Sequence, residues 1–202
     1  MILWGLFNPA GTLEAGRYLV IVADDDQHLE VHDLQTGAVG ILKEDNSLSV
    51  GGVLPPAFDP TGKYLAYGTG SGVTKMYELE ALVADPDSPP VLEVTAHLGA
   101  VPAVSVRSDG TLATAGVEGM YRIWDAAGQL LVELEVGLLE DFVSVGFSPD
   151  GNDLFYQDTG GVIRKYPMDL DVLVDLANSR LTRTLTEAEC QTYLHVEACP
   201  GN

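Results

Sequence analysis

Short apolar runs separated by turn sequences recur along the whole chain. Four of them each follow a turn that ends in glycine: Tyr18 to Ala23, Tyr64 to Tyr67, Leu112 to Ala115 and Leu154 to Tyr156. Apolar runs of this kind, bounded by Gly, Pro and Asp, are typical of β-strands. Apolar and polar positions do not alternate cleanly within them, which predicts strands with both faces buried. The pattern therefore predicts an all-β fold.

The runs belong to a longer repeat. A turn motif recurs at steps of 41 to 51 residues, and the strand that ends each copy closes on an aromatic or His residue. Pro or Asp together with Gly supplies the backbone angles that a tight turn needs. The turns are Phe7–Gly11, Phe58–Gly62, Val106–Gly110 and Phe147–Gly151, and the closing pairs are His32-Asp33, Tyr77-Glu78, Trp124-Asp125 and Tyr166-Pro167. This periodicity predicts four units, at about 1-45, 46-95, 96-138 and 139-167.

The third unit resembles one repeat of the WD-repeat β-propeller family. It has Ala96-His97 near its entry, Ser108-Asp109-Gly110 after its first strand and Trp124-Asp125 at its end. The resemblance implies a β-propeller of about four WD-repeat-like blades, either complete or part of a larger propeller. In the family the N-terminal strand often completes the last blade, which Met1 to Phe7 could do only if this chain closes by itself.

The same resemblance implies a buried hydrogen-bond network in the third unit. Its expected members are His97, Thr114 and Trp124, completed by an acidic residue in the second turn. Glu118 stands at that position, where the family usually has Asp. Asp125 closes the unit, and all five residues are expected to have structural roles rather than catalytic ones.

The periodicity changes after Pro167. Leu170, Leu173 and Leu176 fall at helical spacing behind Asp169, a suitable N-cap, and Thr186 to Glu189 is a capping box for a second helix. Residues 168-202 are therefore predicted to form a two-helix tail. The tail resembles the C-terminal end of bacterial, especially actinobacterial, WD-repeat proteins, which implies that the chain is the last part of a larger regulatory or signalling protein.

The charge of the chain limits the classes of molecule that it is expected to bind. Its 30 acidic and 10 basic side chains give a net charge of −20, which repels phosphate backbones and argues against nucleic-acid binding. The chain has no apolar stretch long enough to span a bilayer and no secretory signal, so we expect a cytoplasmic protein with no membrane partner. Its two cysteines are too few for a disulfide framework.

Cys190, His195 and Cys199 form the one cysteine-containing cluster in the tail. A structural zinc site generally needs four ligands, and no fourth is evident, so we expect no metal there. Two interpretations stay open for the cysteines, a Cys190–Cys199 disulfide or two small buried side chains that pin the tail.

Other candidate chemistry has a simpler structural explanation. Asp24 to Asp26 lacks the ligand spacing of a calcium loop and is predicted to be a solvated turn. His28 and His32 lie on one strand face but have no visible third metal ligand. Arg180 and Arg183 could bind phosphate, but we expect them to complement a helix C-terminus and the acidic surface of the chain.

The sequence contains none of the common phosphate-loop, nucleophile-elbow or zinc-protease motifs. We therefore expect a non-catalytic protein-binding scaffold or sensor module, without a cofactor, that uses rim loops and the face where turns gather. The alternative is a regulatory domain of an enzyme, an ATPase or kinase, encoded upstream of this chain. Upstream domains or blades of the same polypeptide are also candidate partners.

Overall fold

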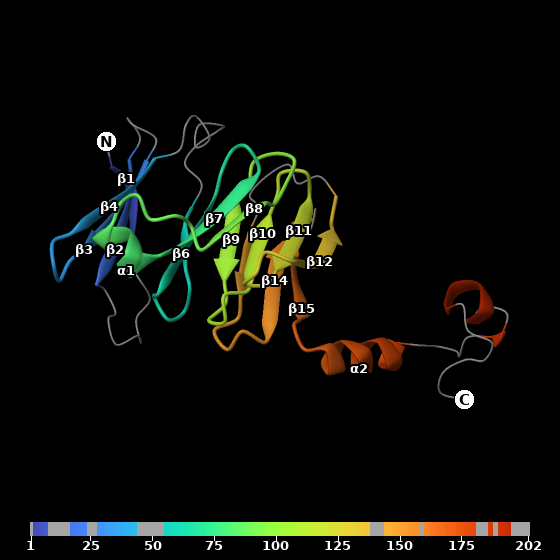
Figure 1. The fold of residues 1–202 in the computed structure, drawn as a ribbon. Coiled ribbons are helices and arrows are strands. Elements are labelled where there is room, and N and C mark those ends of the chain that lie inside the picture. Colours follow the sequence, from blue (N-terminus) through green and yellow to red (C-terminus); the bar gives the residue numbers. More distant parts are fainter. Residues whose placement is uncertain are drawn as a thin grey trace. The chain divides into compact units, whose positions relative to one another are not determined.

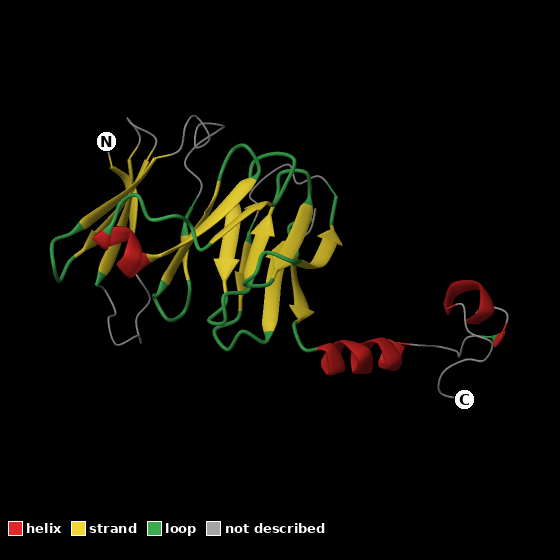
Figure 2. Cartoon of the chain, viewed as in Figure 1, coloured by secondary structure: helices red, strands yellow, loops and turns green. Residues whose placement is uncertain are grey.

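Strands dominate the computed structural model, in which the described residues are 2–7, 17–23, 28–43, 55–137, 144–157, 160–180, 186–187 and 190–194 (Figure 2). The described strands form four antiparallel sheets, each built from strands that follow one another in the sequence. The chain separates into two compact units, Met1–Tyr166 and Pro167–Asn202. The first unit holds the sheets, and the predicted all-β fold is confirmed at this level.

The first two sheets each have four strands. In the first, the order is β1 (Ile2–Phe7), β2 (Tyr18–Ala23), β3 (His28–Asp33) and β4 (Val39–Lys43). In the second, the order is β5 (Ala57–Phe58), β6 (Tyr64–Gly68), β7 (Val73–Glu78) and β8 (Leu92–Thr95). The N-terminal strand β1 pairs with β2, with Leu6 opposite Val20, and so belongs to the first sheet.

The third sheet is also four-stranded, and the fourth has three described strands (Figure 1). The third contains β9 (Ala103–Val106), β10 (Leu112–Ala115), β11 (Met120–Trp124) and β12 (Leu130–Glu135). The fourth contains β13 (Val145–Phe147), β14 (Asp153–Gln157) and β15 (Ile163–Pro167). The four apolar runs predicted as strands are thus confirmed as β2, β6, β10 and β14.

The recurring turns have the geometry that their sequence predicts. Gly62, Gly110 and Gly151 have φ angles of 73°, 85° and 73°. Each backbone N–H donates to the carbonyl oxygen three residues earlier, at 3.0, 2.9 and 2.8 Å. Positive φ favours glycine because a side chain there meets the backbone. The first copy of the turn lies outside the described residues.

Strand β6 shows why the apolar runs do not alternate. Leu65 and Tyr67 belong to a buried cluster shared with β2, β3 and β4 of the first sheet. Ala66, between them, belongs to a second cluster shared with β9 and β10 of the third sheet. A strand with a sheet on either side buries both of its faces, so successive residues are all apolar.

One helix of the first unit was not predicted. Helix α1 (Leu79–Ala84) follows β7 and buries Leu79 and Leu82 in the first cluster. Leu82 fits against Gly40 of β4, where a Cβ atom would lie 2.9 Å from Leu82 Cγ. Six residues are too few to show helical periodicity. The acidic, Pro-rich segment that follows, 85–90, is mostly exposed, as predicted for a surface loop.

The second unit contains the predicted first helix. Helix α2 spans Leu170–Arg180, and the Asp169 Oδ1 atom accepts hydrogen bonds from the backbone N–H groups of Asp171 and Val172 at 2.8 and 3.3 Å. A short π-helix, η1 (Cys190–Leu194), lies where the second helix was predicted. The described helices all fall short of the length and apolarity needed to cross a membrane.

Candidate functional site

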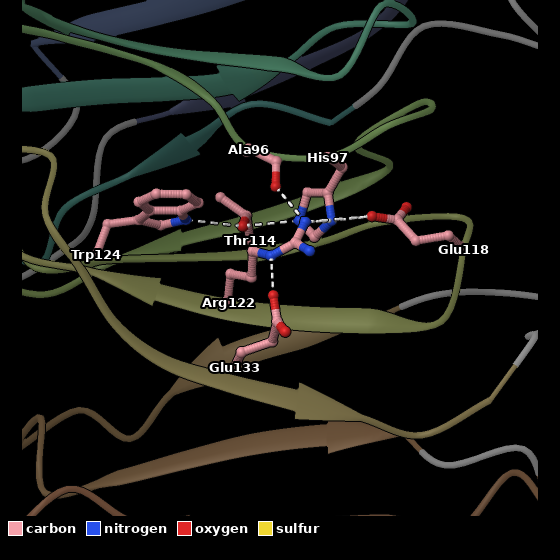
Figure 3. Close-up of polar contacts among 7 residues, drawn as sticks. All are labelled: Ala96, His97, Thr114, Glu118, Arg122, Trp124 and Glu133. Carbon is pink, nitrogen blue, oxygen red and sulfur yellow. Dashed lines mark hydrogen bonds and ion pairs between the residues drawn. The ribbon is translucent and has the colours of Figure 1, made fainter.

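A buried polar cluster lies in the third sheet, beside the loop that joins β8 to β9 (Figure 3). His97 comes from this loop, Thr114 from the centre of β10, and Trp124 from the end of β11. His97, Thr114 and Trp124 are 3%, 0% and 9% exposed. Glu118 comes from the turn between β10 and β11. The structure thus brings four of the five predicted residues together.

Three hydrogen bonds join these side chains in series, with every donor pointing from the Trp124 end towards Glu118. The Trp124 Nε1–H group donates to Thr114 Oγ1 at 3.1 Å. The threonine hydroxyl then donates to His97 Nε2 at 2.8 Å, and His97 Nδ1–H donates to Glu118 Oε1 at 2.7 Å. A carboxylate is an acceptor only, so His97 Nδ1 carries a proton, and burial favours the neutral ring, which leaves Nε2 to accept from the threonine hydroxyl. The imidazole is therefore the neutral Nδ1–H tautomer.

Arg122 adds a cation that the sequence analysis did not identify. Its Nη1 atom donates to the Ala96 carbonyl oxygen at 2.6 Å and to Glu118 Oε1 at 3.3 Å. Its Nε atom donates to Glu133 Oε2 on β12 at 2.6 Å. Arg122 faces Thr114 across the β10–β11 ladder, which places its guanidinium beside the network. In the sequence, the feature that could have identified Arg122 is its position two residues before Trp124.

Burial determines the ionisation of the network. Burial lowers the pKa of His97 and outweighs the opposing effect of the Glu118 carboxylate, and the nearby Arg122 charge lowers it further. Burial raises the pKa of Glu118, but its own backbone N–H, His97 and Arg122 together bring that pKa below its ordinary value. Near neutral pH the network therefore holds a neutral histidine and a carboxylate shared by two donors.

Gly116 leaves the space that the His97–Glu118 pair occupies. A Cβ atom at this position would overlap the His97 ring, with 2.6 Å to its Cγ, and would also overlap the Glu118 carboxylate. Glu118 Oε2, on that side, is buried and accepts no hydrogen bond from the described residues. A side chain at position 116 would force the pair apart.

Asp125 lies outside the network. Its Oδ1 atom accepts hydrogen bonds from the backbone N–H groups of Ala127 and Gln129 at 2.9 and 2.8 Å, so it closes the turn between β11 and β12. Asp33 stands at the same place in the first sheet. It is 1% exposed and accepts from Arg17 Nη2 at 2.8 Å, which lowers its pKa well below the usual range.

The network also fixes the loop in which His97 lies. The backbone N–H groups of Ala96 and His97 both donate to the Gly72 carbonyl oxygen, at 2.8 and 3.0 Å. The Val101 N–H group donates to Thr69 O at 3.1 Å. The loop 96–101 is therefore attached to the second sheet through its backbone and to the third sheet through the His97 side chain.

The remaining candidates are structural or only partly described. His28 Nε2 and His32 Nε2 lie 3.2 and 2.8 Å from the two carboxylate oxygens of Glu30, a partner that sequence reasoning did not identify. Cys190 is buried and disulfide-bonded. Asp24 to Asp26, Arg183, His195 and Cys199 lie outside the described residues. No set of three or more potential metal ligands is grouped within the described parts of the chain.

Comparison with solved structures finds chains of similar fold, whereas comparison with protein families and curated proteins finds no relative. No protein-family model and no curated protein matches the chain. In contrast, 1202 chains of solved structures match its fold, so the fold by itself does not select a function. One is from the crystal structure of the mitotic checkpoint complex, with a TM-score of 0.59 and 15% identity. The match covers 83% of this chain and 52% of that chain. The chain thus spans about half the length of that protein, and its antiparallel sheets fit a WD-like β-propeller.

Proposed function

We propose that the chain is a non-catalytic protein-binding scaffold or sensor module, the C-terminal WD-repeat part of a larger regulatory or signalling protein. The observation that carries the proposal is the attachment of loop 96–101 by the buried network. Both ring nitrogens of His97 and the hydroxyl of Thr114 are hydrogen-bonded within the network. The network holds a surface loop in one conformation, which reduces the entropy cost of ordering that loop when a partner binds.

The composition and the comparison support the same role. A net charge of −20 favours association with basic protein surfaces and opposes association with phosphate backbones. The matched chain of known structure is part of a complex, the mitotic checkpoint complex. Its greater length, of which this chain spans 52%, is consistent with further blades or domains upstream.

Affinity capture tests the proposal. The immobilised chain is exposed to lysate of its native cell, and bound proteins are identified with and without an excess of the free chain as competitor. The proposal expects at least one protein that the free chain displaces. If every bound protein is unaffected by the competitor, the scaffold function is wrong.

The alternative is a regulatory domain of an enzyme, an ATPase or kinase, encoded upstream of this chain. The coding sequence before Met1 distinguishes the two, because the alternative requires an open reading frame that contains a nucleotide-binding or kinase domain. An enzyme in its own right would instead show turnover on a hydrolase panel that disappears in His97→Ala or His195→Ala.

A further inference from the structure

Leu98 is the most exposed large apolar side chain of the described residues. It is 95% exposed, although it directly follows the buried His97. Exposed leucines are common on protein surfaces and by themselves indicate nothing. Leu98 differs because the backbone on both sides of it is held by hydrogen bonds.

Residues on both sides of Leu98 are attached to neighbouring elements by hydrogen bonds. Ala96 is held by Gly72 and also accepts a hydrogen bond from Arg122 Nη1. After Leu98, the Ala100 carbonyl oxygen accepts a hydrogen bond from the Val117 N–H group at 3.1 Å. Binding through a loop that is already ordered loses little backbone entropy, so less of the apolar contribution of Leu98 is offset by the ordering of the loop.

Val117 extends the apolar surface next to Leu98. Its side chain is 45% exposed, and a Cβ atom on Gly99 would lie 3.0 Å from Val117 Cγ2. Gly99 therefore lies against Val117, and Leu98, Gly99 and Val117 are here termed the Leu98 patch. Its two halves come from the β8–β9 loop and the β10–β11 turn, which the His97–Glu118 hydrogen bond joins underneath.

Charge determines which kind of protein segment the Leu98 patch attracts. Arg122, the cation beneath it, is paired with Glu118 at 3.3 Å and with Glu133 at 2.6 Å. Its charge is therefore outweighed by the two carboxylates and by the net charge of −20 on the whole chain. A field of this sign steers positively charged segments toward the surface and repels acidic ones.

We infer that the Leu98 patch is a docking site for a positively charged segment of another protein, which covers Leu98 with its own apolar side chains. This inference rests on the proposed protein-binding function and names the surface and the chemistry of the partner. The apolar contact supplies affinity, and the basic residues of the partner supply selectivity and a fast association rate.

A peptide library tests the site directly. Random linear peptides displayed on phage are selected against the whole chain, and the enriched peptides are synthesised for binding measurements by fluorescence anisotropy. If the Leu98 patch is the docking site, the enriched peptides should have a net positive charge and at least one large apolar residue. They should bind more weakly as the salt concentration is raised. Leu98→Ser should weaken their binding by about 10- to 100-fold, the value of burying one leucine.

Leu131→Ser is the matched control, because Leu131 on β12 is also an exposed leucine, at 53%. It should bind the selected peptides as the unchanged chain does. Both variants should keep the urea unfolding midpoint of the parent, since neither side chain is buried. Enrichment of acidic peptides, or equal binding to Leu98→Ser and the parent, would overturn the inference.

The protein captured from lysate separates the two proposals. Loss of that protein in Leu98→Ser, with retention in Leu131→Ser, supports the site. Retention in Leu98→Ser overturns the site and leaves the scaffold function standing. If neither lysate nor library yields a ligand that the free chain displaces, the scaffold function itself is overturned, and the site with it.

Discussion

Thr114→Val tests the buried network at its centre. Valine matches threonine in shape, so the packing of β10 is kept while the hydroxyl is removed. Trp124 Nε1–H then loses its acceptor at 3.1 Å, and His97 Nε2 loses its donor at 2.8 Å. Both groups are buried too deeply for water to replace the hydroxyl, since Trp124 is 9% and His97 is 3% exposed.

The expected loss follows from these two unsatisfied groups. An unpaired buried polar group costs about 1 to 3 kcal/mol, so the two in Thr114→Val should lower the free energy of unfolding by about 2 to 6 kcal/mol. This is a large part of the stability of an ordinary domain, about 5 to 15 kcal/mol. At a urea dependence of about 2 kcal/mol per M, the unfolding midpoint falls by about 1 to 3 M.

Thr74 on β7 provides a control of opposite sign. It is 0% exposed like Thr114, but its hydroxyl has no hydrogen-bond partner in the described part of the chain. Thr74→Val removes a buried unsatisfied hydroxyl and should leave stability unchanged or raise it. The same Thr-to-Val exchange therefore has different outcomes at two buried strand positions.

Urea unfolding followed by tryptophan fluorescence measures both variants against the parent. Trp124 lies in the network and reports its loss directly. A loss below about 0.5 kcal/mol for Thr114→Val would refute the reasoning, because the typical surface substitution is of that size. Equal losses for Thr114→Val and Thr74→Val would refute it as well.

Three further predictions use the same unfolding assay. Gly116→Ala should destabilise the chain by about 1 to 3 kcal/mol, since its Cβ would overlap the histidine and carboxylate of the network, whereas Gly146→Ala, with no atom within 4 Å of the new Cβ, should not; equal effects would contradict the steric account. Because burial lowers the pKa of His97 below 6.5, the unfolded chain takes up a proton below about pH 6.5 that the folded chain does not. Stability should therefore fall from about pH 7.5 to about pH 5.5, by at most about 1.4 kcal/mol per unit, and His97→Gln should lose that part of the pH dependence; an unchanged slope in the variant would refute a neutral His97. Asp33→Ala should cost about 2 to 4 kcal/mol because it removes a buried carboxylate that accepts hydrogen bonds from Arg17 and from two backbone N–H groups, and Asp125→Ala only about 1 kcal/mol because it removes turn bonds alone; similar losses would show that the arginine pair adds nothing.

The strand and turn predictions succeeded where the information is local. A turn such as Phe58–Gly62 needs a glycine at positive φ, and few other residues tolerate that backbone, so the turn can be recognised from its own residues. The same holds for the helix behind Asp169, whose carboxylate caps it within three residues. The Cys190–Cys199 pairing and the second capping box stay predictions, because Cys199 and Glu189 lie outside the described residues.

The misses depend on contacts between distant parts of the chain. Helix α1 has too few residues for a periodic signal and is stabilised by placing Leu82 against Gly40 of another sheet. From the sequence alone, Arg122 is an ordinary strand residue. Its partners, Glu133 on β12 and the Ala96 carbonyl oxygen of the loop, lie beside it only in the folded chain. Glu30 is different, because it lies between His28 and His32 on one strand and alternate residues of a strand share a face, so this partner was recognisable from the sequence.

The sequence by itself determined the all-β class and the turns, and its resemblance to a WD repeat implied the residues of the buried network. The class and the turns are properties of short segments, because strand and turn preferences act over a few neighbouring residues. Only the tertiary structure decided that β1 pairs within the first sheet, that Asp125 stays outside the network, and that Leu98 projects from a loop held on both sides. Such features depend on which carbonyl, carboxylate or backbone N–H lies within about 3 Å after packing, and positions far apart in the chain supply those groups.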